Sequence, residues 1–164
     1  MLGKKGVSPF IAFILVVVIS IAGVIIVMRI GSPLLEKTEE YSNSENAKNT
    51  MMEINSAIKE VSFEGNGSSR SLSIRNKKGV YRVSSSRDEL TYTLNTKDYL
   101  FSDDLSRKEG DIYMEFNNRT LVYRINHTEV DMVSDERWSS GSYQIVVKNE
   151  GYSGGKTRVS ISVL

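Results

Sequence analysis

A pair of basic residues and a small residue stand directly before a long apolar stretch near the start of the chain. Lys4, Lys5 and Gly6 are followed by Val7-Ser8-Pro9, and no charged residue occurs from there to Met28. Basic and small side chains at the amino-terminal edge of an apolar segment suit cleavage by a protease that faces the cytoplasm. A cut at this edge leaves the apolar helix on the mature chain, where it can serve in a membrane and later in helix-to-helix packing.

A second group of residues that could do chemistry lies further along the chain. His127, Glu129 and Asp131 alternate, so in an extended segment they point the same way and could hold a divalent cation. Three polar residues on the solvated face of an edge strand give the same string, and we favour that interpretation. The remaining acidic pairs are interpreted as loop acids: Asp103-Asp104 and Asp135-Glu136.

The residue types give no support for catalysis. His127 is the only histidine, so a Ser-His-Asp arrangement would depend wholly on it. Neither a Gly-x-Ser-x-Gly motif nor a phosphate-binding glycine loop is present in the sequence. Cysteine is absent, which excludes disulfides, thiolate metal sites and cysteine nucleophiles. The sequence therefore predicts no enzyme, no metal and no cofactor.

The charge balance and the glycosylation sequons bear on partners. Lys and Arg number 21, and Asp and Glu number 20, so no broad basic face argues for nucleic acid. Three Asn-x-Ser/Thr sequons begin at Asn66, Asn118 and Asn126, all downstream of the apolar stretch, on the side where glycosylation happens. Trp138, beside Ser-Gly turns, is a candidate for glycan or surface recognition, but a loop Trp folded onto the sheet is favoured.

The apolar stretch is long enough to cross a bilayer. About 22 residues at about 1.5 Å each reach about 33 Å, against a hydrocarbon core of about 30 Å. Ser20-Ile21-Ala22 would pass as a secretory cleavage site, but the apolar run continues to Met28. A cut there would leave an apolar segment at the start of the mature chain. An uncleaved single-pass anchor explains the length equally well. Lys4 and Lys5 would hold its amino terminus in the cytoplasm, because positive charges favour that side. Arg29, on the other side of the apolar stretch, reduces the difference in positive charge between the two sides.

The order Lys4-Lys5-Gly6-Val7-Ser8-Pro9-Phe10-Ile11-Ala12, followed by an apolar helix, resembles the class III signal peptide of archaeal type IV pilins. The resemblance implies that a prepilin peptidase removes residues 1–6 and leaves Val7 as the mature amino terminus. It also implies an assembly ATPase and a platform protein as partners. Phe10 stands where Val is usual, and Ile11 replaces the Glu of bacterial pilins, so no buried carboxylate sets the assembly register. The implied processing site comprises Lys4, Lys5, Gly6, Val7, Ser8 and Pro9.

Residues 31–63 are predicted to form an amphipathic helix. Ser32 is a suitable N-cap and Pro33 suits the first helical position, so we expect a break or kink at Gly31-Ser32-Pro33. The stretch 42–46 is expected to be too polar for burial. Apolar residues recur at spacings near three, four and seven, and those at the far end are expected to pack on the chain's own sheet. The apolar positions are Leu34, Leu35, Tyr41, Met51, Ile54, Ile58 and Val61.

Further along, the hydrophobic pattern changes to period two, which is typical of antiparallel strands buried on one face. A two-residue turn at Asn117-Asn118 would place Met114 opposite Leu121. Ile112 and Tyr123 would then share the same face. The alternating pairs begin at Leu72/Ile74, Tyr81/Val83, Leu90/Tyr92, Ile112/Met114, Leu121/Tyr123, Ile145/Val147 and Val159/Ile161.

A second hairpin is predicted in the first part of this region. Pairing Asn76 with Gly79 places Ile74 opposite Tyr81, so that both side chains lie on one face. Two hairpins with self-consistent faces favour a single β-domain over residues 64–164.

Together these elements predict an α+β protein, with a long N-terminal helix followed by a C-terminal antiparallel β-sheet domain. The expected divisions are a leader (1–6), a transmembrane and filament-core helix (7–30), an amphipathic helix (31–63) and an extracellular β-domain (64–164). The resemblance implies a pilin-like subunit, inserted in the membrane with its amino terminus inside. Copies of the chain would assemble with one another into a cell-surface filament for attachment. A monomeric membrane-anchored receptor domain, or a minor pilin or pseudopilin of a tip or secretion complex, remain alternatives.

Overall fold

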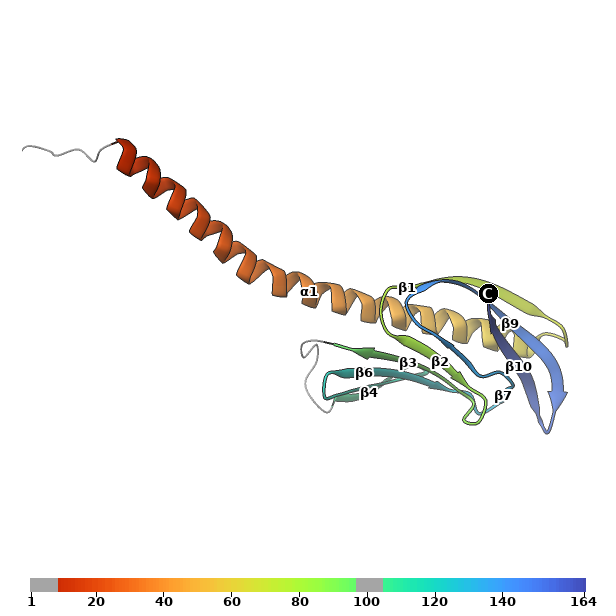
Figure 1. Ribbon diagram of the computed structural model, residues 1–164. Coiled ribbons are helices and arrows are strands. Elements are labelled where there is room, and N and C mark those ends of the chain that lie inside the picture. The colour runs from red at the N-terminus through yellow and green to blue at the C-terminus, as the bar shows by residue number, and fades with distance from the viewer. Residues whose placement is uncertain (1–8, 97–104) are drawn as a thin grey trace, which may run out of the picture. The chain divides into compact units, whose positions relative to one another are not determined.

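A single long helix, α1 (Pro9–Phe63), opens the described part of the chain. The computed structural model of the protein describes residues 9–96 and 105–164. These divide into two units, one before and one after the boundary between Glu39 and Glu40, and α1 runs from the first into the second (Figure 1). The predicted long N-terminal helix followed by β-sheets is confirmed.

Helix α1 continues through Gly31-Ser32-Pro33, so the predicted break there, with Ser32 as N-cap, is wrong, while the kink expected as its alternative stays a prediction. Pro33 has no amide proton to donate to the carbonyl of Arg29, and an interior proline costs about 3 kcal/mol relative to alanine. Helix propagation is cooperative, so the long helical stretches on both sides carry the helix past this defect. The two helical segments expected over 7–30 and 31–63 are parts of one helix.

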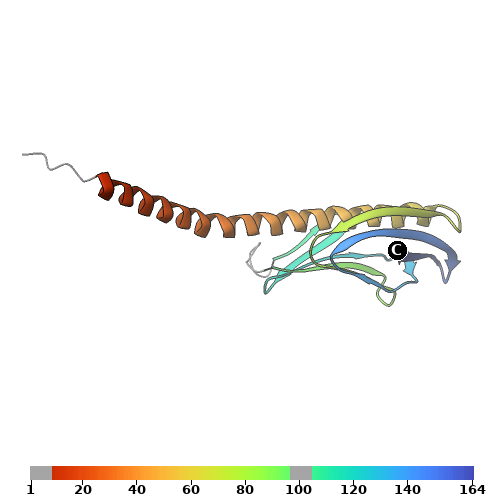
Figure 2. The ribbon, with the colours of Figure 1, turned by 45° about the horizontal axis from the view of Figure 1, so that its top comes forward.

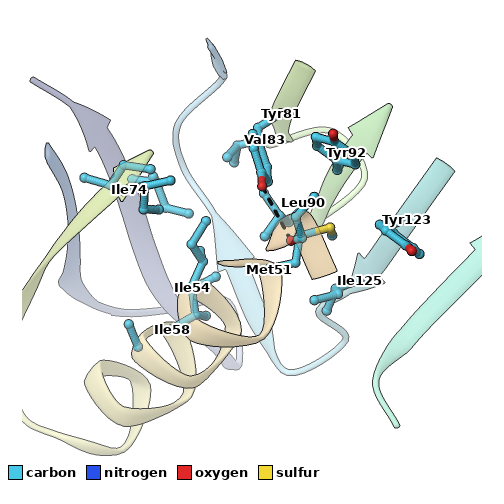
Figure 3. Packing of buried hydrophobic residues seen from close by; sticks show 14 of the residues in the cluster. Met51, Ile54, Ile58, Ile74, Tyr81, Val83, Leu90, Tyr92, Tyr123 and Ile125 are labelled. Carbon is cyan, nitrogen blue, oxygen red and sulfur yellow. Dashed lines mark hydrogen bonds between the residues drawn. The ribbon is translucent and has the colours of Figure 1, made fainter. Parts of the chain in front are cut away.

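Within the second unit, α1 buries one face against the sheets. The side chains of Met51, Ile54, Ile58 and Val61 are fully buried, which confirms that they pack on the chain's own sheets. Figure 3 shows three of them facing side chains from both sheets. Each such burial contributes about 1.5–3 kcal/mol relative to exposure in water. The helix is therefore part of the core of this unit.

The described residues form ten strands in two sheets. One sheet has the order β1-β9-β10-β7, and the other has the order β4-β5-β6-β3-β2-β8. Neighbouring strands are antiparallel except β10 and β7, which are parallel. The second half of α1 lies along the sheets (Figures 1 and 2). The strands are β1 (Ser69–Asn76), β2 (Val80–Ser84), β3 (Glu89–Asn95), β4 (Leu105–Glu109), β5 (Ile112–Asn117), β6 (Thr120–Asn126), β7 (Val130–Met132), β8 (Glu136–Trp138), β9 (Gly141–Ser153) and β10 (Lys156–Val163).

The turn between β5 and β6 lies one residue later than predicted. Asn118 and Arg119 form it, with φ angles of 46° and 62°, as a type I′ turn requires. The shift places Met114 opposite Tyr123 instead of Leu121. Moving the turn by one residue moves each partner by two, so the same side chains still face the core.

The second predicted hairpin is not formed. β1 pairs with β9, whereas β2 pairs with β3 and β8, so Ile74 and Tyr81 lie in different sheets. The Asn76 side-chain amide donates hydrogen bonds to the carbonyl oxygens of Gly79 (3.1 Å) and Ser139 (2.8 Å). These bonds hold the short connection where the chain crosses from one sheet to the other.

The polar stretch 42–46 is partly buried, whereas the sequence predicts that it is too polar for burial. Asn43 and Ser44 are buried. The Ser44 hydroxyl shares a hydrogen bond of 2.7 Å with the hydroxyl of Tyr123 on β6. A buried polar group costs free energy only when it lacks a partner, and this partner lies 79 residues away in the sequence.

Replacing Ser44 with Ala is expected to lower the free energy of unfolding by about 1–3 kcal/mol, because the buried Tyr123 hydroxyl loses its partner. The double variant Ser44→Ala/Tyr123→Phe should lose less than the sum of the two single losses. Urea unfolding of the full chain in detergent micelles, followed by circular dichroism, measures these differences. Ser73→Ala, at an exposed position on β1, is the control, and strictly additive losses would contradict a stabilising Ser44–Tyr123 bond.

Candidate functional site

The first part of α1 presents an extended apolar surface. Fifteen large apolar side chains between Phe10 and Met28 are exposed. Of the described helices, this one is long and apolar enough to cross a membrane by length and composition. That property is compatible with a single-pass membrane anchor.

The lone hydroxyl side chain in this stretch is satisfied inside its own helix. Ser20 donates from its Oγ to the carbonyl oxygen of Val16, at 2.8 Å. Such a bond removes the cost of placing a hydroxyl in an apolar environment. A Cβ added to Gly23 would meet no atom within 4 Å, so this chain itself does not require glycine there. The exterior of the helix between Pro9 and Met28 is therefore apolar on every side.

The predicted processing site lies mostly beyond the described residues. Lys4, Lys5, Gly6, Val7 and Ser8 fall outside them. The described chain begins with Pro9, which lies in α1.

All three sequon asparagines lie on the surface of the second unit. Asn66 is in the turn between α1 and β1, Asn118 is in the β5–β6 turn, and Asn126 ends β6. Each residue is exposed. All three sequon asparagines are therefore accessible to solvent.

The alternating acidic group around His127 does not form a cation site. β6 ends at Asn126 and β7 begins at Val130, so the intervening residues turn instead of continuing one strand. Among the described residues, no group of three His, Cys, Asp or Glu side chains is placed to hold a metal. Glu129 is exposed, whereas Asp131 lies 3.6 Å from the Arg158 guanidinium.

His127 itself is buried, so its placement on a solvated strand face is wrong. It lies beside a cavity of about 540 Å³ that Asn55, Lys59 and Asp111 also line. Its Nε2 has no hydrogen-bond partner among the described residues. Burial lowers the pKa of His127, and the nearby Lys59 ammonium lowers it further, against the opposing charges of Asp111 and Asp88.

The buried His127 is expected to make stability depend on pH below its unfolded pKa of about 6.5. Its folded pKa is lower, so the unfolded chain takes up the proton first. The stabilisation is complete above about pH 6.5 and is lost as pH falls toward the folded value. Urea unfolding of the full chain between pH 7.5 and pH 5 should show this slope, and His127→Gln should flatten it. Parallel pH profiles for the two chains would contradict the assignment.

Trp138 is a core residue of β8 and not a loop or recognition residue. Its ring stacks on that of Tyr81, with centroids 5.2 Å apart and planes 9° from parallel. Asp135 accepts hydrogen bonds from the Ser85 amide and hydroxyl, both at 2.9 Å, and these bonds lower its pKa. Sequence patterns did not place Trp138 in a strand because β8 spans only three residues. The acidic pair Asp103-Asp104 lies outside the described residues.

No protein-family model, curated protein or solved structure matches the chain.

Proposed function

We propose that the protein is a structural, pilin-like subunit that assembles through its apolar N-terminal helix into a cell-surface filament. In this proposal a prepilin peptidase cuts the membrane-inserted precursor between Gly6 and Val7. An assembly ATPase and a platform protein then move the mature chain from the membrane into the filament. The β-domain faces outward and makes the attachment contacts.

The observation that carries the proposal is the uncovered apolar surface of α1 between Phe10 and Met28. Burying one such side chain is worth about 1.5–3 kcal/mol, so fifteen exposed ones correspond to tens of kcal/mol. Lipid covers this surface in the membrane. When the chain leaves the membrane, a bundle of identical helices is an arrangement that covers it again.

The motif ahead of this surface supports assembly over simple anchoring. An anchor needs length and an uncharged interior, which the helix has. It does not need a basic pair and a small residue before Val7, whereas removal of a short leader does. The three exposed sequon asparagines support an extracellular position for the second unit.

Mass spectrometry of the chain from native membranes and from sheared surface filaments tests the proposal. We expect a mature amino terminus at Val7 in both fractions. An intact Met1 or Leu2 confined to membranes would overturn the filament function and favour a monomeric anchored receptor domain. A Val7 terminus found only in trace amounts at filament tips would favour a minor pilin.

A further inference from the structure

The register of the six-stranded sheet aligns basic side chains from four distant segments in one row. Across β8, β2, β3 and β6 the paired residues are Arg137, Arg82, Thr91 and Arg124. The same row continues through Tyr113 on β5 and ends at Lys108 on β4. Five intervals of about 4.8 Å make the row about 24 Å long.

The residues of this row lie on the outer face of the sheet. Along each of these strands, side chains alternate between the two faces. Their sequence neighbours Leu90, Tyr92, Tyr123 and Ile125 are buried against α1 and the other strands. The row therefore faces away from the core.

The outer face carries more basic than acidic side chains, although Glu115 on β5 also lies on it, beside Arg124 and Tyr113. A shallow cavity of about 720 Å³ on this face is lined by five basic side chains and one acidic side chain. The acid, Glu89, is buried and already engaged, because its carboxylate lies 3.1 Å from Arg87 and 3.6 Å from Arg124. The five basic residues are Lys78, Arg82, Arg87, Arg124 and Arg137.

Two of these arginines are available to an external anion, although Arg82 also attracts the nearby Asp135 carboxylate. Arg82 and Arg137 are exposed, and neither forms a salt bridge with a described residue. A guanidinium presents a planar fork of donors that matches carboxylate and sulfate-like oxygen pairs. Like charges on adjacent strands repel each other, so an anion placed between Arg82 and Arg137 would relieve that repulsion.

The uncharged residues of this face suit sugars better than nucleobases. Thr91 and Thr93 line the cavity beside the arginines. The Thr91 hydroxyl donates to the carbonyl oxygen of Arg82 at 3.3 Å, so it can accept from a sugar hydroxyl while that bond is kept. Tyr113 is half-exposed, with the Lys108 ammonium 4.8 Å from its ring centroid. Of the described residues on this face Tyr113 alone is aromatic, whereas single-stranded nucleic acid is held by successive aromatic stacking platforms.

We propose that the row Arg137–Arg82–Thr91–Arg124–Tyr113–Lys108 binds an acidic polysaccharide, with its anionic groups against the arginines and the lysine. An extended polymer that repeats its charge matches a row whose cations stand one or two strands apart. The inference deepens the proposed function, since it names the surface by which the second unit would attach. It rests on that function only in placing this unit outside the cell.

Binding of alginate and of heparin to the full chain in detergent micelles tests the row. Arg82→Glu/Arg137→Glu is expected to weaken binding about tenfold or more, because two charge-assisted contacts become repulsive. The matched control is Arg75→Glu/Arg107→Glu, two exposed arginines off the row. Arg107 is adjacent to Lys108 on the same strand but points to the other face. The control should change affinity less than twofold, and circular dichroism checks that both variants fold.

Each alternative result would overturn the proposal. An equal loss of affinity in the two double variants would indicate a general effect of net charge and no binding by the row itself. Binding to neutral dextran as tight as to alginate would contradict an acidic polysaccharide as the ligand. No binding to either acidic polymer would contradict it as well. Tighter binding to an oligonucleotide or to polyglutamate would assign the row to another macromolecule. The binding assay does not depend on where the mature amino terminus lies. Failure of the mass-spectrometry test of filament assembly can therefore be told apart from failure of polysaccharide binding by the row.

Discussion

A chain carrying Gly6→Phe is expected to accumulate in membranes as an uncut precursor and to be nearly absent from surface filaments. In the proposed processing, the residue before the cut enters a protease subsite shaped for a small side chain. A site built for a small residue excludes a benzyl group sterically. In the proposed assembly, the unremoved basic pair would also keep two charges at the end of the helix that leaves the lipid. Intact-mass measurement of membrane and filament fractions reads out both consequences.

Gly3→Phe provides the matched control for that experiment. It makes the same substitution within the same leader, three residues further from the proposed cut. Normal maturation of the Gly3 variant together with failure of the Gly6 variant would locate the cut. If both variants matured normally, cleavage between Gly6 and Val7 would be wrong.

Replacing Trp138 with Ala is expected to lower the free energy of unfolding by about 3–5 kcal/mol. The side chain is 3% exposed, stacks on Tyr81 and belongs to the buried hydrophobic core. Removing it leaves a cavity beneath a three-residue strand that has few other contacts to hold it. Trp138→Phe should cost much less, because it keeps an aromatic ring and removes an indole N–H that has no partner among the described residues.

Urea unfolding followed by circular dichroism measures these losses, since Trp138 is the only tryptophan and its fluorescence disappears with it. Phe63→Ala is the control, because that ring at the end of α1 is 85% exposed. We expect its effect to stay within about 0.5 kcal/mol. Comparable losses for Trp138→Ala and Phe63→Ala would contradict the core role of Trp138.

Helices and strands could be predicted wherever apolar residues repeat at the spacing typical of that element. Helical spacing identified the buried positions from Met51 to Val61, and period two identified most strands, because both signals depend on side chains close in sequence. The unbroken passage through Pro33 could not be predicted from local preference. Cap and proline preferences amount to a few kcal/mol at most, and the cooperative continuation of a 55-residue helix overrides them.

Long-range pairing explains the remaining differences. The burial of Ser44 depends on Tyr123, and no window around Ser44 contains that partner. The alignment of Arg82, Arg124 and Arg137 likewise arises only when the order of strands and their register are known. A net charge of +1 conceals this alignment, since a nearly neutral total permits an uneven distribution over the surface.

In the proposed function α1 passes from lipid into a bundle of its own copies, and the hydrogen bond from Ser20 to Val16 eases that passage. A hydroxyl paired with a lipid headgroup or with a neighbouring chain would have to break that bond on leaving and form another on arrival. Ser20 carries its acceptor with it, one turn back along the same helix. The transfer from bilayer to protein bundle then exchanges one hydrocarbon coat for another, with no hydrogen bond broken on the way. The Ser20 hydroxyl therefore has the same hydrogen-bond partner among lipid chains as among copies of the helix.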